Sequence, residues 1–361
     1  MKNIHKIAVL VVLMMAVSVS SIYAGNDKRR GTAGAMDLLI NPWAHSAGWG
    51  SVSVANVRGL DAFYSNIAGI AFVNKMEFAY SNTIYLGGKS GLRSGAGINA
   101  FGLAVRLFDR GVVGASVTAF GFGNIDRTTV ESPEAGSNGT FSISYMNINV
   151  AYSHSFTNSI HGGVNLKLVT EQTADIKATG FAIDAGIQYV TGENDQLKFG
   201  MSLKNWGPSM SYKGVGHAVS IENDFGNDVT LEYRSASMEL PTCLNIGASY
   251  DFFIPAADQR ITLAGSFTSN AFLKDNITLG LEYSLFNIVQ LRGGYVFVFE
   301  NQSRTNRTTA NSGLCAGASV DVPLSKKKAD GSMRPTLAIE YAYRAAFPMK
   351  GSHSIGATIK F

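Results

Sequence analysis

Seven titratable side chains fall on the inward faces of segments that alternate as extended strands, so they could meet inside the fold. They are Lys167, Asp184, Lys198, Glu282, Arg292, Glu340 and Arg344. Two carboxylates held close together could serve as acid and base, whereas carboxylates beside Lys or Arg would pair with them and with water. Because the interior of a barrel commonly holds such polar pairs, we interpret these residues as lining a lumen rather than as a catalytic centre.

Other signatures of catalysis or metal binding do not appear in the sequence. Histidines 45, 154, 161, 217 and 353 are spread along the chain without a metal-spaced pair such as HExxH. No Gly-x-Ser-x-Gly elbow occurs in a strand-to-helix context. We therefore expect a chain that is not an enzyme and has no metal or cofactor. Cys243 and Cys315 could form a disulfide, but we favour two small inward-facing residues on separate strands.

The composition is typical of a barrel that crosses a membrane. The 361 residues are 46% hydrophobic and 16% charged, with 39 glycines, 21 phenylalanines and 14 tyrosines. Soluble domains carry about 25% charge. No segment after the amino-terminal leader has the roughly 18 apolar residues of a membrane helix. A modest net charge of +4 predicts no nucleic-acid partner. Membrane insertion would then require a closed barrel, which satisfies its own backbone groups.

The last eleven residues show the strand pattern most clearly. His353, Ile355, Ala357, Ile359 and Phe361 share one face of an extended strand, and polar or small residues share the other. An amphipathic last strand that ends on Phe resembles the carboxy-terminal signal of bacterial outer-membrane β-barrels. The alternative is the last strand of a soluble sandwich, but the same alternation recurs along the chain.

The alternation predicts an all-β fold, a transmembrane antiparallel β-barrel of about fourteen strands. Leu279, Leu281, Ile339 and Tyr341 should face lipid, with Glu282 and Glu340 facing the lumen. In residues 139–157 the apolar face switches, which predicts a bulge near Met146 or Asn147. The expected strands are 76–86, 95–108, 111–128, 139–157, 160–174, 178–192, 196–206, 242–254, 259–270, 275–286, 288–302, 312–324, 334–344 and 351–361.

Two segments precede the predicted barrel of residues 76–361. Residues 1–24 have a basic start, an apolar run and small residues up to Ala24, which predicts a secretory signal peptide; an uncleaved anchor helix is the alternative. Residues 25–75 combine small residues with scattered aromatics and do not alternate. They predict a small hatch-like segment of short helices and turns, at the periplasmic mouth or in the lumen.

Several stretches resemble a known group of outer-membrane proteins. Gly48-Trp-Gly50, Asp61-Ala-Phe-Tyr64, Asn66-Ile-Ala-Gly69 and Leu291-Arg-Gly-Gly-Tyr295 are similar to the FadL-like superfamily, in particular its PorV/PorQ branch of the type IX secretion system. The run from Lys204 to Tyr212 is similar to the same branch. Asn66, Ala68 and Gly69 match the amino-terminal motif of the family, but Ile67 replaces the expected proline.

The resemblance implies a location in the bacterial outer membrane and a non-enzymatic role in type IX protein secretion. The implied partners are the secretion translocon, attachment-complex proteins and the carboxy-terminal domains of secreted cargo, besides the outer-membrane lipid. In the long segment from Trp206 to Pro241, a partner surface would use Trp206, Met210, Tyr212 and Tyr233; an ordinary loop over the barrel mouth is equally compatible. Two other interpretations are a FadL-like channel for hydrophobic small molecules and a structural barrel.

Overall fold

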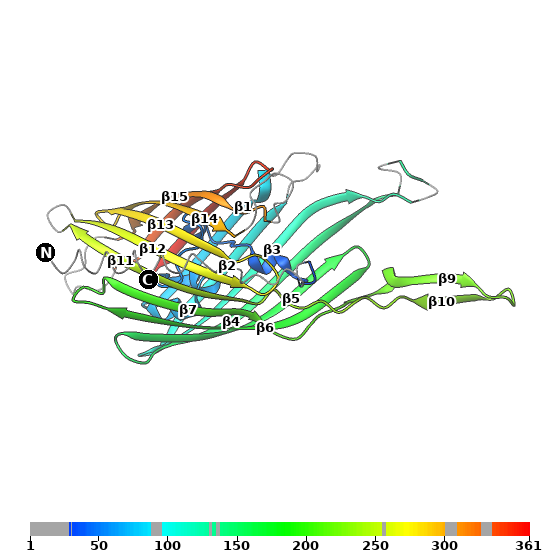
Figure 1. The fold of residues 1–361 in the computed structure, drawn as a ribbon, viewed down its shortest axis with the longest axis horizontal. Helices are drawn as coiled ribbons and strands as arrows, with labels where there is room; N and C mark the ends of the chain where they lie inside the picture. The colour runs from blue at the N-terminus through cyan, green and yellow to red at the C-terminus, as the bar shows by residue number, and fades with distance from the viewer. Residues whose placement is uncertain are drawn as a thin grey trace.

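Fourteen strands in the described part of the chain form a closed antiparallel barrel (Figure 1). The computed structural model describes residues 29, 31–87, 96–129, 132–134, 138–254, 258–299, 309–325 and 334–361. The predicted signal peptide lies outside these ranges, whereas the predicted fold class and strand number are confirmed. The barrel strands are β1 (Met76–Ile84), β2 (Gly97–Phe108), β3 (Gly111–Asp126), β4 (Thr140–Ser155), β5 (Ile160–Thr173), β6 (Ile176–Thr191), β7 (Leu197–Trp206), β11 (Cys243–Ile254), β12 (Gln259–Asn270), β13 (Asn276–Leu285), β14 (Val289–Val298), β15 (Gly313–Pro323), β16 (Thr336–Arg344) and β17 (Ser352–Lys360).

The carboxy-terminal strand closes the barrel. β17 pairs with β16 on one side and with β1 on the other, so that Ile359 lies opposite both Leu337 and Phe78. Every other barrel strand pairs with its neighbours in chain order, with β7 next to β11. Closure leaves no sheet edge, because an unpaired edge in hydrocarbon would leave backbone groups without hydrogen bonds.

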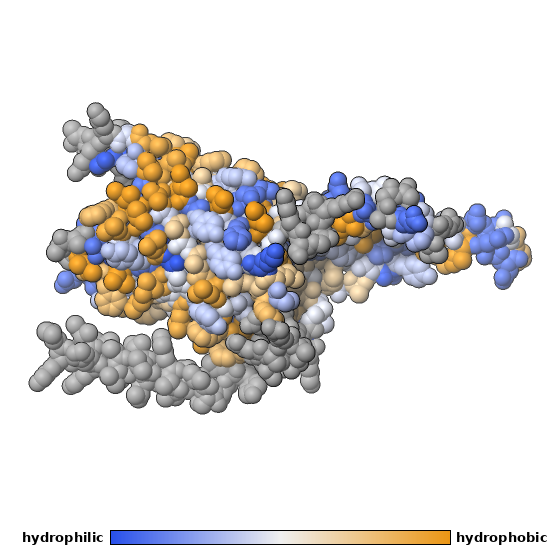
Figure 2. Space-filling model, turned by 90° about the horizontal axis from the view of Figure 1, so that it is seen from above, coloured by the Kyte–Doolittle hydropathy of each residue, from blue (hydrophilic) through white to orange (hydrophobic). Residues whose placement is uncertain are grey.

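The two faces of the barrel wall differ in polarity. Leu279, Leu281, Ile339 and Tyr341 lie on the outer surface, each 45–52% exposed, whereas Glu282 is 5% exposed inside. Figure 2 shows apolar residues spread over one face of the barrel and hydrophilic residues gathered at the projecting end. An apolar outer wall is the face that a bilayer requires. Within the described residues no helix is long and apolar enough to cross a membrane.

The predicted bulge in the fourth strand is wrong. β4 pairs with β5 without interruption from Ile143 to Ser155, and no register shift occurs at Met146 or Asn147. Phe141, Ile143 and Tyr145 instead share the inward face with Asn147, as the alternating burial of β4 shows. The shift between β3 and β4 lies in β3, between Gly121 and Asn124. The apolar residues change face because the surroundings of the strand change, not its register.

The two ends of the barrel are unlike. Short turns join β2 to β3 and β13 to β14 at one end, and the longest connection, from β7 to β11, lies at the other. Long loops mark the extracellular end of outer-membrane barrels and short turns the periplasmic end. The long connection contains β8 (Tyr212–Lys213), η7 (Val215–His217), and the hairpin of β9 (Ala218–Glu222) and β10 (Asp228–Glu232), which projects far from the barrel (Figure 1).

The segment before β1 forms a plug inside the barrel. It contains η3 (Met36–Leu39), α2 (Ala44–Ala47), η4 (Gly59–Phe63) and η5 (Ile67–Phe72), all short, as the small and aromatic residues of this segment predict. Another short turn of helix, η6 (Tyr85–Gly87), follows β1. Trp43, Leu60 and Ile70 of the plug form a buried apolar cluster with inward-facing residues of β1 to β4. The plug thus supplies the apolar core that the polar lumen lacks.

Candidate functional site: the plug and the cavity above it

The plug is held by hydrogen bonds from the motif residues that the sequence singled out. The side-chain Oδ1 of Asn66 accepts from the Ala68 N–H at 3.2 Å and so caps η5. Its Nδ2 donates to the carbonyl oxygens of Val54 at 2.8 Å and of Ile187 in β6 at 3.0 Å. Asn66 and Ala68 are buried, and Gly69 packs beneath Val57. One side chain therefore ties the helix start, the plug chain and the wall together.

Wall glycines allow the plug backbone to approach the strands closely. A Cβ built on Gly294 of β14 would lie 2.5 Å from the carbonyl oxygen of Trp49, and one on Gly317 of β15 would lie 2.8 Å from the Cα of Gly48. Real Cβ atoms keep larger separations, so only glycine fits at these two positions. The plug and the wall are therefore complementary in shape, main chain against main chain.

Arg106 of β2 fixes the junction between the plug and the first strand. Its Nε and Nη2 atoms donate to the carbonyl oxygens of Ala71, Val73 and Asn74 at 2.6–2.9 Å, and Nη1 donates to the backbone carbonyl oxygen of Asp109 at 3.0 Å. These carbonyls at the end of η5 would otherwise lack partners. Sequence reasoning missed this residue. The available signal was a single arginine on an inward face that otherwise carries small and apolar side chains.

Another set of polar contacts joins the plug to the opposite wall. His45 Nδ1 lies 3.4 Å from the Asp61 carboxylate, and His45 Nε2 lies 2.7 Å from Nη2 of Arg292 in β14. Burial alone would raise the pKa of Asp61, but hydrogen bonds from His45 and Ser46 hold that pKa below its usual value. Asp61 therefore stays ionised at the centre of the plug and orients His45 toward the wall.

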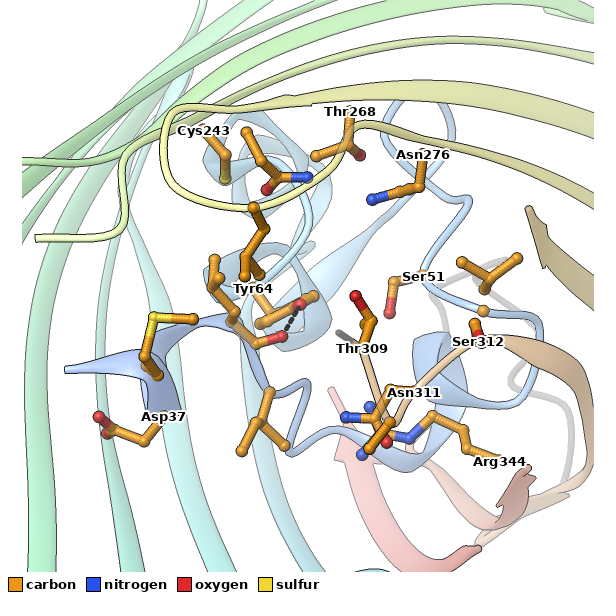
Figure 3. Close-up of a pocket in the computed structure, with 18 of the residues that line it drawn as sticks. Asp37, Ser51, Tyr64, Cys243, Thr268, Asn276, Thr309, Asn311, Ser312 and Arg344 are labelled. Atoms are coloured by element: carbon orange, nitrogen blue, oxygen red, sulfur yellow. Dashed lines mark hydrogen bonds between the residues drawn. The ribbon is translucent and has the colours of Figure 1, made fainter. Parts of the chain in front are cut away.

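A cavity of ≈ 460 Å³ lies between the plug and the loops of the extracellular end (Figure 3). The plug contributes Val54 and Tyr64, and the wall contributes Ile98 and Phe120 as apolar surface. Polar side chains also line the cavity: Ser51 from the plug, and Asn245, Ser266, Thr268, Asn276, Thr309, Asn311, Ser312 and Arg344 from the strands and loops of the barrel. Cys243 and Cys315 also line it, as free thiols on separate strands. This volume is within the usual range for small-molecule sites, and the lining suits a ligand with apolar and polar parts.

Most of the predicted lumen residues lie inside the barrel and pair with each other. Lys167 and Asp184 are 2.7 Å apart, and Lys198 pairs with Asp251. Glu282 accepts from Arg292 at 2.7 Å and also pairs with Arg260. Such pairs neutralise charges that burial would otherwise make costly. These ion pairs agree with the interpretation that these residues line the lumen.

Two of the predicted lumen residues stand apart from these pairs. Glu340 is buried beneath the plug beside Gly356. Arg344, at the extracellular end of β16, is 7% exposed and lines the cavity. No hydrogen bond or salt bridge to its guanidinium occurs among the residues that the structure describes, and its Nε and Nη2 are buried without a partner.

The four residues predicted for a partner surface divide into two pairs. Trp206 and Tyr233 are 60% and 64% exposed. Met210 is buried at 3% against Leu240, and the Tyr212 hydroxyl donates to Glu171 inside the barrel at 2.6 Å. The start of the long connection folds back over the wall, because Met210 and Met238 exchange two backbone hydrogen bonds. Trp206 and Tyr233 are therefore exposed, whereas Tyr212 is half-buried and Met210 is buried.

Asp37 is a buried acid of the plug next to the wall. Burial raises its pKa to about 6, although the Asn147 side chain donates to it at 2.7 Å and Lys167 opposes the shift. Glu171 adds to the increase. The Oδ1 atom of Asp37 has no hydrogen-bond partner.

Among the described residues no three His, Cys, Asp or Glu side chains are grouped to hold a metal ion.

Comparison with known proteins identifies the fold. No protein-family model matches the chain, and no curated protein matches it by sequence. Among solved structures it is similar to the CymD monoaromatic hydrocarbon channel, with 13% identity, a TM-score of 0.55, and coverage of 90% of this chain and 98% of the other. The Ralstonia pickettii toluene transporter TbuX is 11% identical with a TM-score of 0.52, and the match covers 87% of this chain and 98% of the other. The Pseudomonas putida toluene transporter TodX is 13% identical with a TM-score of 0.52, and the match covers 86% of this chain and 97% of the other.

These similarities concern architecture, because the identities are low. Together with the apolar outer wall, these similarities in fold indicate that the chain is a β-barrel of the bacterial outer membrane. The expected FadL-like architecture is confirmed: the chain has the fold of the FadL-like outer-membrane channels, a fourteen-stranded barrel with a plug in its lumen.

Proposed function

We propose that this protein is an outer-membrane channel that takes a hydrophobic small molecule from the extracellular side into the cavity above the plug. The observation that carries the proposal is the cavity itself, ≈ 460 Å³ in volume and bounded below by plug residues such as Val54 and Tyr64. The likeness in fold to a monoaromatic hydrocarbon channel and two toluene transporters supports it. Passage would require the plug to move, since its backbone lies against the wall.

The extracellular lip of the barrel offers an apolar approach to the cavity. Phe122 of β3 and Tyr145 of β4 both line it, with ring centroids 5.2 Å apart in an edge-to-face arrangement. Phe141 and Ile143 continue the same inward face of β4 away from the plug. A hydrophobic molecule would therefore leave water on this surface before it reaches the cavity, where burial of its apolar area provides the binding energy.

Two neighbouring substitutions on β14 test this function. Val296 lines the cavity, whereas Phe297 is 44% exposed on the outer wall. Val296→Trp should fill part of the cavity and weaken the binding of butylbenzene at least tenfold, while Phe297→Trp should leave binding unchanged. Calorimetric titration of the detergent-solubilised full chain measures both. If butylbenzene does not bind the wild type, or binds both variants equally, the proposed site is wrong.

We propose as a second function that the β9–β10 hairpin binds a protein partner at the cell surface. Val219, Ile221, Val229 and Leu231 lie on one face of the hairpin, and each is 39–46% exposed. A two-stranded hairpin alone is marginally stable in water, so an uncovered aliphatic face favours a partner. A secretion translocon, an attachment-complex protein or secreted cargo, as the PorV-type resemblance implies, is the partner class for this candidate.

The two faces of the hairpin provide the test of the second function. Ile221→Asp changes the aliphatic face, and Ser220→Asp changes the polar face beside it. Copurification from native outer membrane, with partners identified by mass spectrometry, should lose a translocon or cargo protein in the first variant only. Equal recovery in both variants would remove the hairpin from the partner hypothesis.

A further inference from the structure

The first described residues of the plug are paired with the long extracellular connection. Ala33 and Glu239 form a parallel β-bridge, and the Gly34 N–H donates to the Glu239 carbonyl oxygen at 2.9 Å. The plug therefore contributes a short extended segment to the outer rim of the barrel. We call the pairing of residues 31–34 with residues 238–240 the latch.

The side chains that hold the latch at the rim make weak contacts. Glu239 forms an ion pair with Arg29, whose guanidinium carbon lies 4.7 Å from the centroid of the Phe272 ring. The two charged side chains are 42% and 57% exposed, and exposed ion pairs contribute little to stability because water and salt screen them. The later part of the plug is fixed inside the barrel by Asn66 and Arg106. The latch is therefore the part of the plug that opens first.

The latch is continuous with the strand pairing at the base of the long connection. Met238 and Met210 exchange two backbone hydrogen bonds of 2.8 Å next to the bridge with the plug. A Cβ built on Gly34 would lie 3.0 Å from the Cβ of Met238, so the two segments are in close contact. Residues 233–237 are the whole link between β10 and Met238, and a link of this length spans at most about 20 Å. A large displacement of the β9–β10 hairpin therefore moves the latch.

Ala35, the next residue of the plug, is held in a left-handed conformation. Its φ of 49° and ψ of 43° place its Cβ close to a carbonyl oxygen, which is unfavourable for an alanine. Ala35 is 2% exposed and packs in one cluster with Met210 and Leu240 of the long connection. A strained conformation persists only where the surrounding structure imposes it. Withdrawal of Met210 and Leu240 therefore lets the chain relax at Ala35.

The residues that follow Ala35 form part of the wall of the cavity. The lining from this segment consists of Met36, Asp37, Leu39 and Ile40 (Figure 3). The Tyr64 hydroxyl donates to the Leu39 carbonyl oxygen at 2.7 Å and joins this wall to the rest of the plug. The latch, the strained residue and the cavity wall are thus one continuous segment, which can move while the later plug stays in place.

We propose that the long connection regulates the plug: a protein that binds the β9–β10 hairpin and displaces it opens the latch and widens the cavity. The inference rests on the two proposed functions and adds the means by which the partner controls the channel. Displacement of the hairpin withdraws residues 238–240, the chain relaxes at Ala35, and residues 36–40 leave the cavity wall. Because coupling is reciprocal, opening of the latch also changes the position of the hairpin.

The two native thiols of the cavity report whether the latch controls it. Cys243 and Cys315 line the cavity and are buried. Gly34→Val crowds Met238 and should speed the modification of Cys243 by a water-soluble maleimide about tenfold, the effect of modest overpacking. Gly293→Val is the control, because a Cβ at Gly293 would meet nothing within 4 Å. Heat-modifiable mobility on gels shows that each variant has a folded barrel.

A disulfide across the latch gives the opposite perturbation. In Gly34→Cys with Met238→Cys, the Cβ separation must widen by only about half an ångström to suit a disulfide. The oxidised pair should slow the modification of Cys243 at least fivefold relative to the same protein after reduction and removal of the reductant. Peptide-resolved mass spectrometry distinguishes Cys243 from the introduced thiols.

The position of the hairpin is measured with spin labels at Phe225→Cys and Phe297→Cys, which are exposed at the hairpin and on the outer wall. With Cys243 and Cys315 replaced by alanine, pulsed electron paramagnetic resonance should show a shifted or broader distance between the labels in Gly34→Val only. Unchanged Cys243 modification in both latch variants overturns control of the cavity by the latch, and an unchanged label distance overturns its coupling to the hairpin. Butylbenzene binding and the Ile221→Asp copurification test the two proposed functions separately, so either function can stand if the latch fails.

Discussion

Replacement of Gly294 by alanine should unseat the plug, and its neighbour Gly293 provides an internal control. The two residues are adjacent on β14 and face opposite sides of the wall. A Cβ at Gly294 would meet the carbonyl oxygen of Trp49 at 2.5 Å and its carbonyl carbon at 2.7 Å. A Cβ at Gly293 would meet nothing within 4 Å. The same chemical change is thus a clash on one face and harmless on the other.

The size of the effect follows from the contact. The Trp49 backbone would have to retreat by roughly 1 Å to reach an ordinary van der Waals separation. Trp49 is 1% exposed and packs with Val52 against the wall, so it cannot move alone. Overpacking of this kind costs about 1–3 kcal/mol. Because each 1.4 kcal/mol is a factor of ten, the population with a displaced plug should rise by roughly 5- to 150-fold.

Flux and proteolysis measure that population independently. Liposomes containing Gly294→Ala should release a small entrapped solute faster than those containing wild type or Gly293→Ala. The plug of detergent-solubilised Gly294→Ala should also be cleaved faster by trypsin, while both variants keep a heat-modifiable barrel. Indistinguishable flux and cleavage for the two alanine variants would show that the plug does not depend on main-chain contact with β14. The complementarity argument would then be wrong.

Three further predictions concern the plug and the closing strand. Arg106→Gln leaves the carbonyls at the end of η5 without their donors and should increase cleavage near Asn74, with Arg110→Gln as the unaffected control. The pKa of Asp37 is raised to about 6 by burial, so its contribution to plug stability is present at pH 4 and is lost as pH rises through 6. Proteolysis of the plug should therefore slow at acidic pH in the wild type, and Asp37→Asn should flatten the dependence. Deletion of residues 358–361 removes pairs with both β1 and β16 and should abolish the heat-modifiable form, whereas deletion of residues 214–227 should preserve it.

The sequence was sufficient for the barrel because strand alternation is a local property. The period of two places Leu281 outside and Glu282 inside whatever their partners are, and closure follows because the last strand needs a neighbour on each side. This local signal could not show that Met210 and Tyr212 fold back into the barrel, since their partners are Met238 and Glu171.

The contacts that seat the plug were beyond the sequence for the same reason. Arg106 meets carbonyls more than thirty residues away, and Gly294 meets Trp49 across a far larger separation. The seven titratable residues could be placed in the lumen by alternation alone. Their pairing could not, and neither could the difference between Arg292, which contacts four side chains, and Arg344, whose guanidinium has no partner among the described residues. That difference depends on the register between strands.

The error in β4 shows how the surroundings of a strand decide which face is apolar. Near the periplasmic end, Ile148 and Val150 point outward and Asn149 inward, as a bilayer outside and a polar lumen inside require. Nearer the extracellular end, Ser142 and Ser144 point outward, and Phe141 and Tyr145 turn inward on the same uninterrupted strand. Where the outer wall meets water instead of lipid, its polar face belongs outside, and the apolar face lines the entrance to the cavity. The change of the apolar face without a register shift therefore marks the level at which the strand leaves the membrane. Under the proposed channel function, the same inward apolar face would lead a hydrophobic ligand from the outside to the plug.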